Sequence, residues 1–253
     1  MPGSRKSNTL RAVAKQRIGV KIPGCYDVTS ALDSQTAGYP AVFVSGSSVG
    51  AALLGEELKP SHRDWYLELL GQICGAVDIP VIADGETGFG DPLTFAADLE
   101  HIGAAGLQIE DRASDGDLLA EDKSVQQIKE LVQSTNLFVL ARTDETAISK
   151  TLAITRANRF LEVGADAVIP ILSTLLASSD QDQLRDYVRR LGQEVAGPVI
   201  IHSPTGSNFD RMPLASWGIS VEIASQICLH DSRTEARDAL RTWTRREDAR
   251  PAP

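Results

Sequence analysis

The sequence predicts a single α/β domain, a (β/α)₈ TIM barrel, on the basis of three observations. Eight short apolar runs rich in Val, Ile and Ala recur along the chain, and most are separated by a stretch with helical spacing. Each run is apolar nearly throughout rather than alternating, as expected for parallel strands that are buried on both faces. A chain of 253 residues without a break in composition suits one barrel domain over 1–253. A doubly wound open sheet is the alternative arrangement of the same elements.

The predicted elements alternate along the chain. The strands are expected at 19–23, 41–45, 80–84, 106–110, 137–142, 167–171, 198–202 and 219–224. The helices are expected at 28–37, 63–76, 92–102, 125–133, 148–163, 181–191 and, as a short one, 213–218. Ahead of the barrel, a basic and frayed start leads into a first helix near 10–16. After the barrel, 231–247 has the mixed charges of a final exposed helix.

The composition argues against several classes of protein. The net charge of −9 disfavours a nucleic-acid partner. No apolar run approaches the roughly 20 residues of a membrane span, so no membrane partner is expected. The basic start lacks the apolar segment of a secretory signal. The three cysteines are widely spaced and form no CxxC pair, which disfavours a zinc or disulfide framework and favours a cytoplasmic location.

Polar residues follow the predicted strands at the point where each one ends. The third strand ends in Asp84, with Glu86 two residues later, and the fourth ends in Glu110. Arg142 ends the fifth strand and His202 the seventh. In a barrel these ends all lie on the C-terminal face, where the loops build the active site. The pattern therefore predicts one site assembled from residues that are far apart in the sequence.

The acids at these strand ends predict a divalent cation site. Two carboxylates at the end of a buried strand are costly without a partner, and a hard cation such as Mg²⁺ relieves that cost. Asp84 is the candidate direct ligand, and Glu86 and Glu110 either ligate the ion or hold its waters. Mn²⁺ is an alternative to Mg²⁺. The competing interpretation of Asp84 and Glu86 is a capped loop with two solvated acids.

Two further features suggest anion binding at the same face. Arg142 offers a planar fork for a carboxylate or phosphonate, although an ion pair with Glu110 or Asp111 is the alternative. The backbone N–H groups of Gly46 and Ser47 could form an oxyanion pocket, with a tight turn as the alternative.

Six segments then carry a resemblance to a known family. In order they are Gly24-Cys25-Tyr26-Asp27, Phe43-Val44-Ser45-Gly46, Asp84-Gly85-Glu86-Thr87-Gly88-Phe89-Gly90, Gly106-Leu107-Gln108-Ile109-Glu110-Asp111, Ala141-Arg142-Thr143-Asp144 and Gly164-Ala165-Asp166-Ala167. In these segments the chain resembles the isocitrate lyase/phosphoenolpyruvate mutase superfamily. The resemblance implies a Mg²⁺-dependent barrel that cleaves or forms C–C or C–P bonds in α-keto or α-hydroxy acids through enolates. It also implies a homo-oligomer, a dimer or tetramer, in which 231–247 is exchanged with a neighbouring subunit.

The resemblance also assigns roles to individual residues. It places Asp84 on the metal, with Glu86 and Glu110 in support. It places the substrate against Tyr26, Arg142 and His202 as catalytic residues and against Ser45, Gly46 and Ser47 at its carboxylate and carbonyl end. His202 has a simpler alternative, since a lone histidine at a strand end is often only a hydrogen-bonded structural residue.

The sequence departs from the family pattern at four places. Glu86 stands where the metal loop usually has a second Asp, Leu58 where an Asp is common, and Ile171 where lyase members carry a Glu. The loop at 111–123 has neither the Lys-x-Cys-Gly-His gate of isocitrate-lyase-like members nor the Lys-x-Asn-Ser gate of phosphonopyruvate-processing members. A standard isocitrate or methylisocitrate lyase is therefore not expected.

Three functions remain open at this stage. The leading one is a Mg²⁺-dependent lyase that cleaves a C–C bond in a small α-keto or α-hydroxy carboxylic acid by retro-aldol cleavage, decarboxylation or hydrolysis. The second is C–P chemistry on phosphonopyruvate, as a mutase or hydrolase. The third is a catalytically idle barrel that binds a ligand. The missing gate thiol and Leu58 favour the idle barrel, whereas Asp84, Glu110 and Arg142 oppose it.

Overall fold

The computed structural model describes residues 2–177, 180–203, 212–230, 232–235 and 237. Eight parallel strands form one sheet in the order β6-β5-β4-β3-β2-β1-β8-β7. They are β1 (Val20–Cys25), β2 (Val42–Val44), β3 (Val81–Asp84), β4 (Gly106–Glu110), β5 (Phe138–Thr143), β6 (Ala167–Pro170), β7 (Ile200–His202) and β8 (Val221–Ala224). The two ends of the order meet, because Val168 of β6 forms a parallel bridge with Val199, just before β7. The predicted (β/α)₈ barrel is confirmed, and the sheet does not have the free edges of an open doubly wound fold.

Successive residues of one strand serve two different cores. Val42 and Val44 of β2 belong to the large apolar cluster between the strands and the outer helices. Phe43, between them, packs inside the barrel with Ile82 of β3 and Leu140 of β5. Both faces of β2 are therefore withdrawn from water, which explains why this strand segment is apolar throughout.

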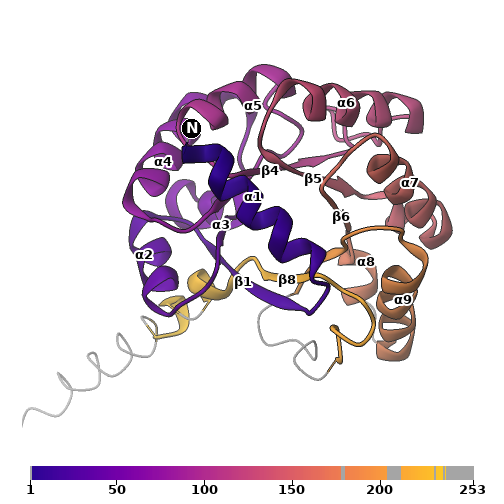
Figure 1. Cartoon of the computed structure of the whole chain (residues 1–253). Helices are drawn as coiled ribbons and strands as arrows, with labels where there is room; N and C mark the ends of the chain where they lie inside the picture. The colour runs from indigo at the N-terminus through magenta and orange to yellow at the C-terminus, as the bar shows by residue number, and fades with distance from the viewer. Residues whose placement is uncertain (1, 178–179, 204–211, 231, 236, 238–253) are drawn as a thin grey trace, which may run out of the picture.

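The outer layer consists of helices that follow the strands around the barrel (Figure 1). The longer ones are α2 (Val28–Thr36), α4 (Arg63–Ala76), α5 (Pro92–His101), α6 (Glu121–Ser134), α7 (Lys150–Glu162) and α9 (Gln181–Glu194). The short ones are α3 (Gly46–Val49), η1 (Gly50–Leu54), η2 (Pro60–His62), η3 (Glu145–Ala147) and α8 (Ser173–Leu176). The helix predicted at 213–218 is instead a turn, in which Trp217 N donates to the carbonyls of Pro213 and Leu214 at 3.2 and 3.1 Å.

The first helix is longer than predicted and has a structural role. α1 (Pro2–Lys15) lies across one end of the barrel (Figure 1), where Leu10 and Ala14 pack against the inward-facing strand residues. Ser7 donates to the carbonyl of Ala105 at 2.8 Å, and Arg11 pairs with Asp166 at 2.8 Å. These partners lie at the beginnings of β4 and β6. α1 therefore covers the N-terminal end of the barrel and leaves the C-terminal end for the polar residues.

The end of the chain is only partly described. Residues 227–230 and 232–235 are helical, but most of the helix predicted at 231–247 lies outside the described residues. Its exchange between subunits therefore stays a prediction. In the part of the chain that the structure describes, no helix is both long enough and apolar enough to cross a membrane.

Candidate active site

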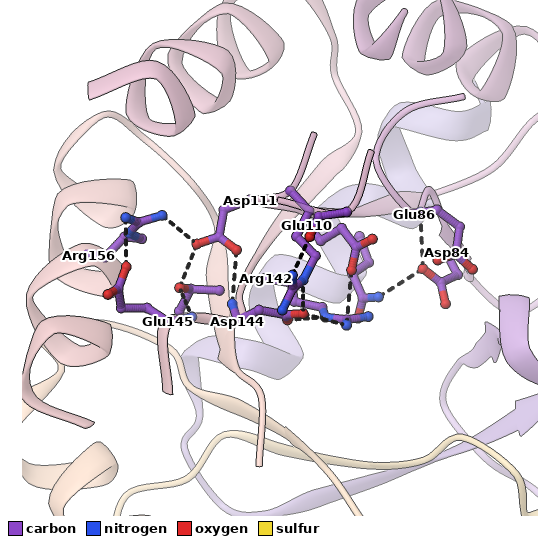
Figure 2. A network of polar contacts seen from close by, with 12 residues as sticks. Asp84, Glu86, Glu110, Asp111, Arg142, Asp144, Glu145 and Arg156 are labelled. Carbon is purple, nitrogen blue, oxygen red and sulfur yellow. Dashed lines mark hydrogen bonds and ion pairs between the residues drawn. The ribbon is translucent and has the colours of Figure 1, made fainter. Parts of the chain in front are cut away.

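At the C-terminal end of the barrel, mostly polar side chains line a cavity of about 330 Å³. They come from the ends of β2, β3, β4, β5, β7 and β8 or from the loops that follow them: Ser45, Ser47, Glu57, Leu58, Asp84, Glu86, Glu110, Arg112, Arg142, Asp144, His202 and Ser225. Figure 2 shows the acids and guanidinium groups of this face in a row that continues beyond the cavity to Arg156. The predicted convergence of strand ends on one site is thus present.

Asp84 is buried at the end of β3. Its Oδ2 accepts the amide of Gly46 at 3.1 Å, and its Oδ1 accepts Gln108 Nε2 at 2.9 Å and the amide of Glu86 at 3.3 Å. Burial raises the pKa of Asp84, although the charge of Arg142 and these three donors oppose the rise. The neighbouring strands therefore hold this carboxylate in one fixed orientation.

Glu86 is directed toward Asp84 by an unusual backbone. Its φ of +48° lies in the left-handed region, which is uncommon for a residue with a side chain and often marks a functional site. Gly85 makes the turn possible, since a Cβ there would lie 2.4 Å from Leu107 Cδ1. The charge of Asp84, then burial and then the charge of Glu110 raise the pKa of Glu86 to about 9. The surroundings of Asp84 and Glu86 thus supply too little positive charge for both carboxylates to be ionised together.

Arg142 holds the other acids of the cavity. Its Nη2 lies 3.0 Å from Glu110 Oε2, and its Nε donates to Asp144 Oδ1 at 2.9 Å. Burial raises the pKa of Glu110 to about 7 although Arg142 opposes it, and Glu110 and Asp144 raise the pKa of Arg142 against the effect of burial. The ion pair with Glu110 that the sequence left open is therefore present. Within the described residues no protein atom accepts from Nη1 of Arg142, so Arg142 can bind a further anion.

A cluster of buried charges outside the cavity supports Arg142 and Asp144. Arg156 of α7 pairs with Asp111 Oδ2 at 2.9 Å and with Glu145 Oε2 at 2.7 Å. Asp111 in turn accepts the hydroxyl of Thr143 at 2.7 Å and the amide of Asp144 at 2.9 Å. Asp111 therefore pairs with Arg156 and not with Arg142. The cluster fixes the backbone that presents Arg142 and Asp144 to the cavity.

His202 reaches the cavity from β7 as a neutral ring. Burial, and then the charge of Arg142, lower its pKa to about 3. Its ring packs edge-on against Phe43 with centroids 5.2 Å apart, and Nε2 is buried without a hydrogen-bond partner among the described residues. An unpartnered buried nitrogen at the wall of a cavity is suited to a hydrogen bond with a bound ligand.

The structure brings most of the predicted site residues together, with two differences. Ser45, Ser47, Asp84, Glu86, Glu110, Arg142 and His202 all line the cavity. The amide of Gly46 is occupied by Asp84, so this N–H does not form the suggested oxyanion pocket. Tyr26 is not among the lining residues, and its hydroxyl lies 3.3 Å from Ser232 Oγ.

Five lining residues were missing from the predicted set: Glu57, Leu58, Arg112, Asp144 and Ser225. Arg112 and Asp144 stand two residues beyond Glu110 and Arg142, within the polar ends of the fourth and fifth strands, but neither was assigned to the site. Ser225 directly follows β8, whose apolar end gave no polar signal. Glu57 and Leu58 belong to a long loop whose path the sequence does not determine.

The donor set fits a hard divalent cation. Among the described residues, no group of three or more His, Cys, Asp or Glu side chains is already arranged as a complete metal centre. Mg²⁺, however, is commonly bound by one or two carboxylates together with waters and substrate oxygens. Asp84 and Glu86 supply such a pair. The raised pKa of Glu86 reflects the shortage of positive charge near these two carboxylates. Glu110 is already paired with Arg142 and is placed to hold water rather than to ligate directly.

Substitution of Gly46 by Ala is expected to weaken metal binding without unfolding the protein. A Cβ at Gly46 would lie 2.0 Å from Glu86 Oε1 and 3.3 Å from Asp84 Oδ2, so the Glu86 carboxylate must move. Titration with Mg²⁺, followed by the rise in melting temperature, should show affinity reduced about tenfold, equal to roughly 1.4 kcal/mol. Gly75→Ala is the control, because a Cβ there meets no atom within 4 Å. Equal Mg²⁺ affinity in both variants would contradict the placement of the ion.

Comparison with known proteins agrees with this geometry. The family model described as phosphoenolpyruvate phosphomutase matches residues 10–242. The chain belongs to this family. It is therefore a member of the isocitrate lyase/phosphoenolpyruvate mutase superfamily, as the sequence motifs indicated.

Individual relatives differ in chemistry. The chain is 33% identical over 203 residues to the chloroplastic carboxyvinyl-carboxyphosphonate phosphorylmutase of Arabidopsis thaliana, a match that covers 71% of this chain and 57% of the relative. It is 28% identical to the 2-methylisocitrate lyase of Aeropyrum pernix over 75% of this chain and 64% of the relative. Both matches thus span less than two thirds of the relative. A phosphonopyruvate hydrolase structure in complex with oxalate and Mg²⁺ has a TM-score of 0.79 at 20% identity, covering 98% of this chain and 92% of that chain.

Proposed function

We propose that the protein is a Mg²⁺-dependent lyase that cleaves a C–C bond in a small α-keto or α-hydroxy carboxylic acid through an enolate fragment. The observation that carries this proposal is that Asp84, Glu86, Glu110 and Arg142 line one cavity together. Its volume of about 330 Å³ suits a small acid. The cleavage is a retro-aldol reaction, a decarboxylation or a hydrolysis.

The residues of the cavity divide into metal-binding and substrate-binding groups. Asp84 would hold Mg²⁺ directly, with Glu86 beside it and Glu110 holding water. Bound there, the ion would supply Lewis-acid stabilisation of negative charge on the oxygen atoms of a pyruvate-like fragment. The similarly folded phosphonopyruvate hydrolase, whose structure is a complex with oxalate and Mg²⁺, supports this choice of ion.

The protein groups provide the remaining interactions. Arg142 keeps Nη1 available for a substrate carboxylate, while its ion pairs with Glu110 and Asp144 fix the direction of the guanidinium. Ser45 and Ser47 place hydroxyl groups at the wall of the cavity, and neutral His202 adds an unpartnered ring nitrogen. These groups orient the acid so that charge develops on the oxygen facing the metal-binding pair.

C–P chemistry on phosphonopyruvate is the second candidate. A phosphonate dianion favours more than one cation, and the cavity offers the guanidinium groups of both Arg112 and Arg142. Relatives described as phosphonate-processing enzymes include the phosphorylmutase of Arabidopsis thaliana. The idle-barrel interpretation has less support, because the buried acids are costly to retain without a function.

Turnover of a small panel of acids tests the proposal. Oxaloacetate, methylisocitrate, citramalate and phosphonopyruvate are incubated with Mg²⁺, with and without protein, and pyruvate, oxalate, phosphate and phosphoenolpyruvate are measured. Pyruvate or oxalate formed from one of the first three acids faster than in the protein-free mixture, and abolished by EDTA, supports C–C cleavage. Pyruvate and phosphate, or phosphoenolpyruvate, formed from phosphonopyruvate alone supports the second candidate. If no acid turns over and Mg²⁺ leaves the melting temperature unchanged, the idle barrel is the better interpretation.

The metal-binding pair also predicts a pH dependence of stability. The pKa of Glu86 is about 9 in the folded metal-free protein, against 4.5 ordinarily, so the folded state binds the proton more tightly. The free energy of unfolding of the metal-free protein should therefore fall as pH rises from about 4.5 toward 9. Glu86→Gln should unfold at a higher temperature than wild type at pH 8 in EDTA, with the difference disappearing near pH 5.

The control for this measurement is Glu68→Gln, which removes an exposed carboxylate of α4 that does not line the cavity. Glu68 is not among the groups that raise the pKa of Glu86, so the melting temperature of this variant should follow that of wild type at each pH. If the difference in melting temperature between Glu86→Gln and wild type is the same from pH 5 to pH 8.5, the charges of Asp84 and Glu86 do not oppose each other.

The proposal extends to assembly and location. We expect a homo-oligomer, a dimer or tetramer, in the cytoplasm. Among the described residues, Ile148 and Leu152 are large apolar side chains left 71% and 50% exposed near the start of α7, which is consistent with a subunit contact. Sedimentation analysis of the full chain would measure the oligomeric state.

A further inference from the structure

A second cavity of about 160 Å³ adjoins the first at the C-terminal end of the barrel. The two cavities share four lining residues, which are Leu58, Glu86, Glu110 and Arg112. The other walls come from the loops after β2, β3 and β4: Lys59, Pro60, Thr87, Phe89, Ala113, Ser114 and Gly116. A molecule bound in the first cavity can therefore extend between these loops into the second.

The loop after β4 is short and folded back on itself. Arg112 and Leu118 form an antiparallel bridge, and the amide of Ala113 donates to the carbonyl of Asp117 at 2.8 Å. Gly116 completes the turn with a φ of +91°, a conformation that favours glycine. In this chain, the segment that replaces the family's gate is thus a compact hairpin that presents Arg112.

Arg112 is held in place but is not saturated. Its Nε donates to Asp144 Oδ2 at 2.6 Å, and its Nη1 donates to the carbonyl of Gly116. Among the described residues, Nη2 has no protein acceptor, and about a third of the side chain (32%) is exposed. A guanidinium fixed through two of its nitrogens can bind an anion through the third with little further loss of side-chain entropy.

We propose that the second cavity binds a carboxylate-bearing arm of the substrate and that Arg112 recognises this carboxylate. The inference rests on the proposed function, because the arm must belong to an acid held in the first cavity. The apolar walls formed by Leu58, Pro60 and Ala113 suit the carbon atoms of such an arm. At about 30 Å³ per water-sized group, about 160 Å³ accommodates two or three carbons and the carboxylate. The substrate is therefore at least a dicarboxylic acid.

Binding of a short monocarboxylate to the oxalate-loaded protein tests this inference, because it supplies the proposed arm alone. Oxalate with Mg²⁺ occupies the first cavity, and butyrate and its uncharged counterpart butyramide are then titrated by calorimetry into wild type, Arg112→Met and Ala113→Leu. Butyrate should bind to wild type at least tenfold more tightly than butyramide, which lacks the carboxylate. Arg112→Met should weaken butyrate binding at least tenfold and more than it weakens oxalate binding. Ala113→Leu keeps every charge but fills the cavity, so it should also abolish butyrate binding.

The control is Arg159→Met, which removes an arginine of α7 that pairs with Glu121 outside both cavities. It should leave both affinities unchanged. The second subsite is wrong if oxalate binds but wild type does not discriminate butyrate from butyramide, or if Arg112→Met and Ala113→Leu bind butyrate like wild type. If oxalate with Mg²⁺ does not bind to wild type, the proposed function itself fails.

Discussion

Replacement of Asp84 by Asn is expected to abolish turnover and the stabilisation of the protein by Mg²⁺. The change keeps the shape of the side chain but removes the charge that would hold the ion at the end of β3. Loss of about 4 kcal/mol of metal-assisted stabilisation of the transition state corresponds to a rate decrease of roughly 10³-fold. Melting temperatures with and without Mg²⁺ measure the binding defect, and product release from the most active acid of the panel measures the catalytic one.

The matched control is Asp91→Asn, the same chemical change at an exposed position only seven residues away. Asp91 caps α5 by accepting the amides of Leu93 and Thr94 at 3.1 and 3.2 Å, and it does not line the proposed site. This variant should lose at most about 1 kcal/mol of stability and should keep its response to Mg²⁺. A rise in melting temperature with Mg²⁺ that is as large in Asp84→Asn as in wild type would exclude Asp84 as the metal ligand.

The largest expected effect on stability belongs to Arg156. Substitution by Met leaves the carboxylates of Asp111 and Glu145 buried without a cation, since their side chains are only 1% and 8% exposed. Breaking a buried ion pair in this way costs about 3–5 kcal/mol. Urea unfolding should therefore show a lower midpoint at an unchanged slope.

Arg159→Met provides the comparison for Arg156, because it removes the same side chain from the same helix. The Arg159 side chain is 41% exposed, and its ion pair with Glu121 is solvated, so the loss should be below about 1 kcal/mol. Combining Arg156→Met with Asp111→Asn and Glu145→Gln removes the unpaired charges and should recover part of the lost stability. Equal midpoints for the two arginine variants would mean that the buried cluster does not stabilise the fold.

Much of the fold could be read from local patterns, and the failures have identifiable causes. The strand 106–110 and the helix 63–76 have the same bounds in the sequence analysis and in the structure. The segment 213–218 was predicted as a short helix from its helical spacing, but it forms a turn. The extent of α1 was underestimated because its stability comes from contacts such as Ser7 with Ala105, which are remote in sequence.

In the site too, some features follow from the local sequence pattern and others from contacts between distant segments. Asp84, Glu86, Glu110 and Arg142 were predicted because each stands at or just after the end of an apolar strand, and parallel strands in a barrel end on one face. The occupied amide of Gly46, by contrast, depends on the distance between β2 and β3. Tyr26 is not among the lining residues, and its hydroxyl lies 3.3 Å from Ser232 Oγ, a contact between residues far apart in the sequence that a local pattern cannot show.

The sequence by itself determined the barrel, its family and the acids of its C-terminal face, because these are properties of local periodicity and of residue order. Only the tertiary structure decided how the charges pair: Arg142 with Glu110 and Asp144, and Asp111 with Arg156. Pairing of buried charges depends on distances between different strands and helices, and the spacing along one strand does not encode them. For the same reason, the second cavity beside Arg112 is visible only once three loops are placed together.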